Sequence, residues 1–205
     1  MSPQPEAAAR RRGRPRSQEA HSAILTATLE LLGAQGFRGL TIEGVAERAG
    51  VGKTTIYRRW PSKTELVAEA IEQIRPPSAP PDSGSLEGDL GGLMRGQQER
   101  VGTTPGLRRL IPVLLTEATQ DPAFLTLVTE GVIEPIRDVM RELVRRGIER
   151  GELRPDVDVE ALVDLLHAVP VYRILLAGGD TSKVGDVPSR VVPLLLAGAG
   201  ARASD

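Results

Sequence analysis

Residues 40–66 of the chain read LTIEGVAERAGVGKTTIYRRWPSKTEL, and this stretch decides the fold. Its apolar spacing predicts two short helices, over about residues 42–49 and 53–59, and Thr41 is expected to cap the first. Gly50-Val51-Gly52 between them predicts a tight turn, because Gly50 lets the chain reverse where a side chain would clash. Two short helices joined by a glycine-containing turn have the geometry of a helix-turn-helix.

The second of these helices carries the candidate DNA contacts. In this motif, the N-terminal part of the second helix reaches base edges in the major groove. Lysine donates hydrogen bonds to guanine, and threonine contacts several bases through its hydroxyl or methyl group. The side chains expected at base edges are Lys53, Thr54, Thr55 and Tyr57. Those expected on phosphates, which position the protein without specifying sequence, are Tyr57, Arg58, Arg59 and Lys63.

Three residues of this stretch have structural alternatives. Trp60 is better interpreted as a core aromatic than as a DNA contact. Tyr57 is either a core residue or a half-buried ring whose hydroxyl reaches a phosphate. Lys63 is either a phosphate contact or a solvated lysine in the first turn of a fourth helix, which Ser62 and Glu65 begin with a capping box.

The run from Leu40 to Leu66 resembles the tetracycline-repressor (TetR) family of bacterial regulators. The resemblance rests on the combination Ala-Gly-Val, Thr-Ile-Tyr, aromatic-Pro-Ser-Lys and Glu-Leu, and it covers residues 18–75 strongly and the rest in layout. It implies an all-α homodimer with an N-terminal DNA-binding domain of three helices, a connecting fourth helix and a variable C-terminal ligand-binding domain. Carried over by position, it implies DNA contacts at Thr41, Lys53, Thr55, Tyr57, Arg59 and Lys63.

Two positions depart from the family pattern. Gly52 stands where the family often has serine, so one helix cap or phosphate donor is missing. Glu43 stands where some members place a basic residue, so no DNA contact is expected there.

The front of the chain is basic and the remainder acidic. Residues 1–75 hold 12 Lys or Arg against 8 Asp or Glu, and residues 76–205 hold 14 against 19. This asymmetry indicates that the front of the molecule meets a polyanion, and a basic tail without a partner is the alternative. Within the first residues, Arg12-Gly13-Arg14-Pro15 resembles the core of an AT-hook. Arg12 and Arg14 are therefore expected either to enter a narrow A·T minor groove or to be loosely attracted to phosphates.

Composition divides the chain into three parts. Residues 1–17, rich in Pro, Ala and Arg, predict a disordered basic arm. The proline-rich run at 76–84 predicts a linker, which ends the helix-turn-helix domain at 18–78 and precedes a C-terminal effector-binding and dimerisation domain at 79–205. Helices are expected in that domain over roughly 86–101, 106–119, 122–150, 159–176 and 187–199. Kinks or breaks are expected at Pro112, Pro135, Pro170 and Pro193. No stretch alternates as a strand does, so the predicted fold class is all-α.

The sequence of the C-terminal domain predicts a dimer interface and a cavity. Its last two helices are apolar around most of their circumference, so we expect them to form the homodimer interface. Helices kinked by proline, with few large aromatics between them, predict an apolar cavity for a small effector. The two methionines in the candidate lining are better interpreted as core residues. The histidine is better interpreted as a core or interface residue than as a ligand contact. The candidate lining residues are Met94, Phe124, Val128, Met140, His167 and Tyr172.

The composition argues against an enzyme and a metal protein. The chain has no cysteine and two histidines, and it lacks a phosphate-binding glycine loop or a nucleophile elbow, so no catalytic residue, cofactor or metal is expected. It has no apolar run of the roughly 18 residues that a membrane span needs, and its arginine-rich start is not a secretory signal, so a cytoplasmic protein is expected.

We therefore expect a sequence-specific DNA-binding transcriptional regulator. The simplest form is a repressor that a small apolar effector releases from a palindromic double-stranded operator. The alternative is a DNA-binding regulator without a small-molecule effector.

Overall fold

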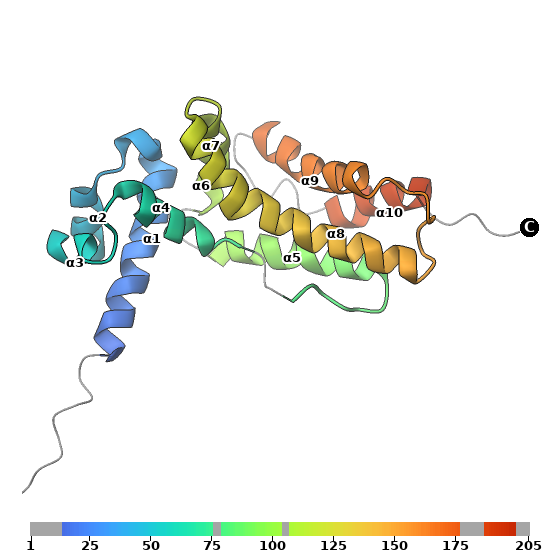
Figure 1. The fold of residues 1–205 in the computed structure, drawn as a ribbon, viewed down its shortest axis with the longest axis horizontal. Coiled ribbons are helices and arrows are strands. Elements are labelled where there is room, and N and C mark those ends of the chain that lie inside the picture. The colour runs from blue at the N-terminus through green and yellow to red at the C-terminus, as the bar shows by residue number, and fades with distance from the viewer. Residues whose placement is uncertain (1–13, 76–78, 104–106, 177–186, 200–205) are drawn as a thin grey trace, which may run out of the picture.

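The computed structural model describes residues 14–75, 79–103, 107–176 and 187–199. These residues form an elongated molecule with α1–α4 at one end and α5 and α8 running along its length (Figure 1). No strand occurs among them, so the predicted all-α class is confirmed. The elements are α1 (Arg14–Gly39), α2 (Ile42–Ala49), α3 (Lys53–Tyr57), α4 (Lys63–Glu72), α5 (Leu86–Thr103), α6 (Leu107–Ala118), α7 (Pro122–Val128), the π-helical turn η1 (Thr129–Ile133), α8 (Glu134–Glu149), α9 (Val159–Leu176) and α10 (Val187–Ala199).

Helix α1 begins at Arg14, earlier than the expected start at Ser17. The sequence allows this, because Pro15 falls in the first turn, where its missing N–H is tolerated. Residues 14–17 therefore belong to the helix and not to a disordered arm. The expected stop at Gly36 is a kink with φ 71° and ψ 175°, after which one more turn follows to Gly39. A side chain at Gly36 would also meet Glu117, since an added Cβ would lie 2.7 Å from its Oε1.

The single helix expected over residues 122–150 is divided into α7, η1 and α8. Asp121 caps α7 by accepting a hydrogen bond from the Ala123 N–H at 2.9 Å. Pro135 has no N–H with which to continue an α-helical ladder to the Gly131 carbonyl. The chain widens by one residue just before it, and the Glu134 N–H donates to the Thr129 carbonyl. The kink predicted at Pro135 therefore takes the form of a π turn.

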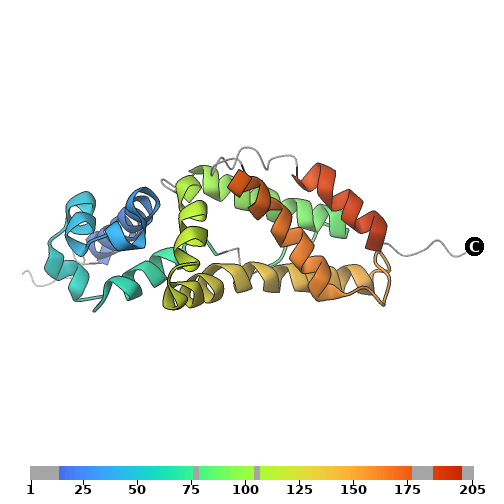
Figure 2. The ribbon, with the colours of Figure 1, turned by 90° about the horizontal axis from the view of Figure 1, so that it is seen from above.

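The DNA-binding helices do not have a core of their own. The buried side chains of α1–α4 continue into Leu110 and Leu114 of α6 and into Phe124 and Val128 of α7. Helix α6 stands between α1 and the rest of the molecule (Figure 2). A second core joins α5, α8 and α9 to Val192 of α10. The two ends of the molecule are therefore connected through packed side chains as well as through the chain.

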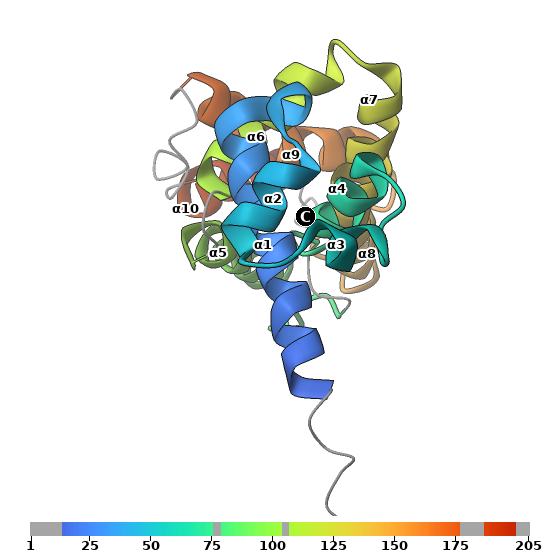
Figure 3. The same ribbon diagram turned by 90° about the vertical axis from the view of Figure 1, so that its left-hand side faces the viewer.

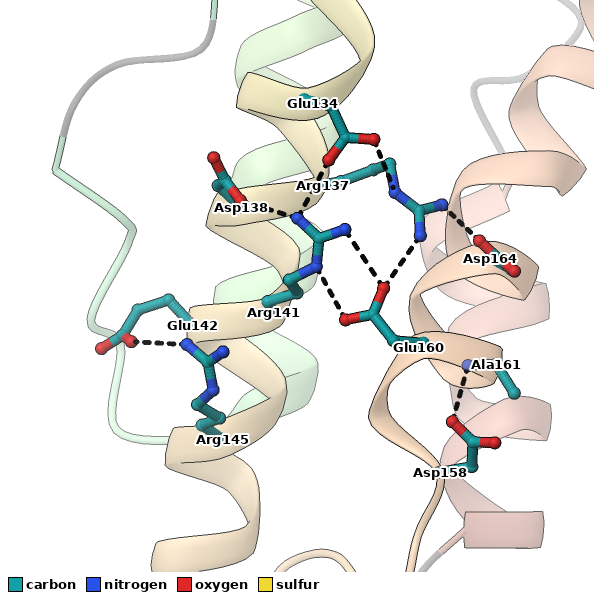
Figure 4. A network of polar contacts seen from close by, with 10 residues as sticks. All are labelled: Glu134, Arg137, Asp138, Arg141, Glu142, Arg145, Asp158, Glu160, Ala161 and Asp164. Carbon is teal, nitrogen blue, oxygen red and sulfur yellow. Dashed lines mark hydrogen bonds and ion pairs between the residues drawn. The ribbon is translucent and has the colours of Figure 1, made fainter. Parts of the chain in front are cut away.

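Ion pairs fix α9 against α8 (Figure 4). Glu160 of α9 accepts hydrogen bonds from Arg141 Nε at 2.8 Å and from Arg137 Nη2 at 3.0 Å. Asp164, one turn further along α9, also pairs with Arg137. Because both arginine side chains are mostly buried, this network sets the position of the helix that carries His167.

Two absences hold for the part of the chain that the structure describes. No helix there is long and apolar enough to cross a membrane. No three side chains of the His, Asp or Glu type gather there in a way that could hold a metal ion.

A buried carboxylate ties the start of α5 to the end of α8. Asp89 is fully buried, accepts a hydrogen bond from the Ser83 N–H, and accepts another from Arg150 Nη1 at 3.0 Å. Burial acts to raise the pKa of Asp89, but the hydrogen bonds from Ser83 and Arg150 outweigh it and hold the pKa below its ordinary value. The carboxylate therefore stabilises the fold in its charged form.

Asp89→Ala is expected to lower the free energy of unfolding by about 1.5–3 kcal/mol at pH 7, the range for hydrogen bonds to a charged group. A group whose pKa is lowered in the folded state contributes stability above its unfolded pKa and loses it as the pH falls through the folded pKa. The difference between variant and wild type should therefore narrow below about pH 4. Urea denaturation at pH 7 and pH 3 measures both effects.

The matched control is Asp82→Ala, which removes an exposed partner of the same arginine at 2.6 Å. An exposed ion pair contributes less than about 1 kcal/mol, so this variant should be close to wild type. Equal losses in the two variants would contradict the role given to Asp89.

Candidate DNA-binding surface and ligand cavity

The turn between α2 and α3 has the predicted geometry. Thr41 caps α2 by accepting a hydrogen bond from the Gly44 N–H at 3.1 Å. Gly50 ends α2 in the left-handed region, with φ 66° and ψ 33°, where glycine is favoured. The Val51 N–H then donates to the Ala46 carbonyl at 3.0 Å, and Ile56 is fully buried as the anchor of α3. The two helices are thus held in a fixed relation that presents the outer face of α3.

Helix α3 lies at the end of the molecule that is formed by α1–α4 (Figure 3). Lys53, Thr54 and Arg58 are exposed, and Thr55 is partly exposed. Tyr57 is 50% exposed, so it is not the core residue that the sequence left open. Trp60, by contrast, is 3% exposed and belongs to the core, as expected. The structure therefore brings the predicted base-edge residues together on one short helix, around the sides that Ile56 does not bury.

Lys53 has a partner that the sequence did not predict. Its ammonium lies 2.7 Å from Glu43 Oε1, so an ion pair joins α3 to α2. The hydrogen bond from Lys53 is the main cause that lowers the pKa of Glu43. Both side chains are exposed, so DNA can compete for the lysine. Glu43, which stands where some family members have a basic residue, thus contacts Lys53 across the turn between α2 and α3.

Two predicted phosphate contacts are engaged within the protein. Lys63 Nζ donates to the Phe37 carbonyl at 2.8 Å and lies 4.5 Å from the centre of the Phe37 ring. Lys63 is therefore not the solvated lysine of the alternative interpretation. Arg59 Nη2 donates to the Ser17 carbonyl at 3.2 Å, which joins the start of α1 to the end of α3. Contact of either residue with phosphates stays a prediction.

Of the two arginines expected to enter the minor groove, the structure describes one. Arg12 lies outside the described residues. Arg14 is the first residue of α1, so the extended Arg-Gly-Arg that the minor-groove prediction needs does not continue through this position. If the arm enters a minor groove, the residues that enter it must therefore precede Arg14.

A cavity of about 350 Å³ lies among α5, α6, α8 and α9, with Ile74, just after α4, in its wall. Four of the predicted residues line it: Met94, Val128, Met140 and His167. Burial is the main cause that lowers the pKa of His167, so this imidazole is neutral at pH 7. The volume is within the range of small-molecule sites.

The other two predicted lining residues lie elsewhere. Phe124 is buried against Phe37 with ring centres 4.9 Å apart, in the core of the DNA-binding helices, because α7 turns this side chain toward α1. Tyr172 is 61% exposed, since five residues along α9 place it about 140° around the helix from His167. The prediction that Phe124 and Tyr172 line the cavity is therefore wrong, because each side chain lies on a side of its helix that does not face the cavity.

Sequence reasoning missed the polar part of the wall. Gln97, Gln98 and Arg100 line the cavity from the last turns of α5. This helix contains five glycines, and its C-terminal half carries charged residues, so its polar side chains are typical of a solvated face. These side chains line the cavity because α5 packs against α6 and contacts the region after α4, and this packing has no signal in the local sequence.

An exposed helix-turn-helix defines the class of protein, the DNA-binding proteins that read the major groove with the second helix of this motif. Residues 24–70 match the family described as bacterial regulatory proteins, tetR family, and residues 80–184 match the tetracyclin repressor-like C-terminal domain. The chain belongs to the TetR family of transcriptional regulators, which are non-enzymatic DNA-binding proteins. The family expected from the sequence is confirmed.

Individual relatives support the same assignment. The chain is 32% identical over 177 residues to the uncharacterized HTH-type transcriptional regulator YdeS of Bacillus subtilis, covering 84% of this chain and 86% of YdeS. It is 29% identical over 184 residues to the DNA-binding transcriptional repressor TetR of Mycobacteroides abscessus, covering 88% and 96%. The crystal structure of the TetR family transcription regulator SCO0332 is similar, with 34% identity, a TM-score of 0.57, and coverage of 85% and 97%.

Lys53→Ala and Arg58→Ala are expected to weaken DNA binding in different ways. Lys53 is predicted to contact base edges, so its loss should cost about 1–3 kcal/mol on the specific sequence and relax the preference for it. Arg58, which follows the last residue of α3, should contact phosphate, so its loss should weaken all duplexes alike and reduce the salt slope by about one. Binding titrations on specific and scrambled duplexes at several salt concentrations separate the two. A uniform loss in both variants would contradict the assignment of Lys53.

Proposed function

We propose that this regulator is a repressor that binds a pseudo-palindromic operator as a homodimer and is released by a small effector bound in the cavity. Lys53, Thr54, Thr55 and Tyr57 read base edges, and the arginines of the arm add electrostatic affinity. Such a repressor acts in the cytoplasm. The observation that carries the proposal is the combination of an exposed α3 with a cavity whose wall includes the residue just after α4.

The dimer interface is assigned to α9 and α10. Large apolar side chains are exposed on both helices, which a monomer in water would bury. They are Leu165, Tyr172, Leu175, Leu176 and Leu194. Two recognition helices related by a two-fold axis then meet two half-sites about one helical turn, or a small multiple, apart.

The coupling between the two sites is geometric. A ligand that prefers a different separation of the recognition helices moves the dimer away from the form that fits successive major grooves. By linkage, such a ligand binds the DNA-free dimer more tightly than the DNA-bound dimer, and by the same factor. The cavity favours this reading over a regulator without an effector.

Selection of bound duplexes from a random library with the full-length protein tests the proposal. The recovered sequences should contain two inverted half-sites at a fixed spacing, bound by one dimer. Recovery of a single half-site bound by a monomer, or of no preferred sequence, would overturn it.

A further inference from the structure

The cavity has one polar end. Its wall is mostly aliphatic, whereas Gln97, Gln98 and Arg100 follow one another on α5. Among the described lining residues, Arg100 is the one with a permanent charge, and none is an aspartate or glutamate. The fourth polar residue, His167, lies on α9 and is neutral at pH 7.

This distribution selects the charge of a ligand. A cation buried in the cavity would find an arginine and no carboxylate, so its lost hydration would go uncompensated. A wholly apolar molecule would bury the guanidinium charge further without adding an acceptor to those that it already contacts in the protein, such as the Arg75 carbonyl. A carboxylate offers two acceptor oxygens, and hydrogen bonds between guanidinium and carboxylate are among the strongest in proteins.

The volume selects the size of the apolar part. At about 30 Å³ for each non-hydrogen atom in a liquid-like filling, the cavity of about 350 Å³ holds roughly a dozen such atoms. A linear carboxylate of ten carbons has this size.

We propose that the effector is an amphipathic monoanion, with an apolar body of about ten carbons and a carboxylate head that binds Arg100. This inference rests on the proposed function, since it names the ligand class of the same cavity. The apolar body lies among aliphatic residues such as Leu93, Ile136 and Ile174, and the head lies at the last turns of α5.

Arg100 also connects the cavity to the DNA-binding helices. Its Nη1 donates to the Arg75 carbonyl at 2.9 Å. Arg75 follows α4, and its own Nε donates to the Gly131 carbonyl of η1 at 3.1 Å. That carbonyl accepts the arginine at the place where Pro135 cannot supply an α-helical N–H. The segment after α4 is therefore held to both α5 and η1 by two hydrogen bonds that meet at Arg75.

A bound carboxylate competes for the same guanidinium. When Arg100 turns toward the ligand head, its hydrogen bond to Arg75 is weakened, and the segment after α4 loses this link to α5 while it keeps the one to η1. Helix α4 packs against η1 at close range, since a Cβ added to Gly131 would lie 3.2 Å from Ile71 Cγ2. The contact at Arg75 is thus the point at which the head group changes the position of the DNA-binding helices.

The test uses the full-length protein with decanoate and decan-1-ol, which have the same apolar body and differ in the charge of the head. Calorimetric titration into DNA-free protein measures binding, and fluorescence anisotropy with the selected operator measures release. Decanoate should bind about 10–100-fold more tightly than decan-1-ol and should release DNA at submicellar concentration. Equal affinity of the two probes would overturn the proposal.

Two variants locate the effect. Arg100→Met keeps an unbranched side chain without charge, so it should lose the preference for decanoate and still bind decan-1-ol. Arg95→Gln, on an exposed position of the same helix, should behave as wild type.

Wild-type decanoate binding by Arg100→Met would overturn the assignment of Arg100. Decanoate binding that leaves operator affinity unchanged would overturn the link through Arg75. Because calorimetry is done without DNA, it gives the ligand class even if the proposed operator mode fails.

Discussion

The double variant Leu176→Glu, Leu194→Glu should be a monomer at micromolar concentration and bind the operator at least 100-fold more weakly than wild type. The two leucines are 72% and 74% exposed on α9 and α10, so the fold of one chain does not need them. In a dimer interface each glutamate would lose its hydration without a partner of opposite charge. A monomer also loses the second recognition helix, which a dimer holds near its half-site at an effective concentration that raises affinity by about 10²–10⁴.

Analytical ultracentrifugation gives the oligomeric state, and fluorescence anisotropy gives the operator affinity. The matched control is Leu125→Glu, which places the same charge on a leucine of α7 that is 47% exposed and lies outside the proposed interface. This control should remain dimeric and bind DNA as wild type does. A double variant that is still dimeric would place the interface on another face of the molecule.

The parts of the fold set by local interactions could be predicted from the sequence. Thr41 and Ser62 cap α2 and α4 through bonds to residues three positions away, and Gly50 adopts the left-handed conformation that ends α2. Each interaction lies within one turn of the chain, so the local pattern contains the whole signal. This is why the helix-turn-helix and its exposed row were predicted to within a few residues.

The parts set by packing between distant helices could not be predicted in the same way. Phe124 has the apolar character expected of a cavity residue, but its ring meets Phe37, 87 positions earlier in the chain. Arg100 has the character of a solvated residue, but the segment after α4 turns it into the cavity wall. Periodicity identifies the apolar face of a helix without saying which neighbour covers it. The cavity was therefore predicted as a region, and its polar end was missed.

Trp60→Ala should lower the free energy of unfolding by about 3–5 kcal/mol, the cost of removing a large aromatic from a packed core. The Trp60 ring stacks on His21 with centres 5.4 Å apart, and its Nε1 donates to Glu69 Oε2 at 2.6 Å. Glu69 also faces His21 Nε2 at 3.2 Å, so one side chain joins α1, the end of α3 and α4. Because this core continues into α6 and α7, we expect the loss to reach beyond the DNA-binding helices.

Two further variants separate packing from hydrogen bonding and folding from DNA binding. Trp60→Phe keeps most of the ring but loses the bond to Glu69, so it should cost about 1–2 kcal/mol. Tyr57→Ala removes an aromatic that is 50% exposed on α3, so it should leave stability within about 0.5 kcal/mol of wild type and weaken operator binding. Urea denaturation followed by circular dichroism measures stability in all three variants, and anisotropy measures binding at temperatures where each is folded. If Tyr57→Ala destabilised the protein as much as Trp60→Ala, the division between a core aromatic and a DNA-facing aromatic would be wrong, because both rings would then be needed by the fold.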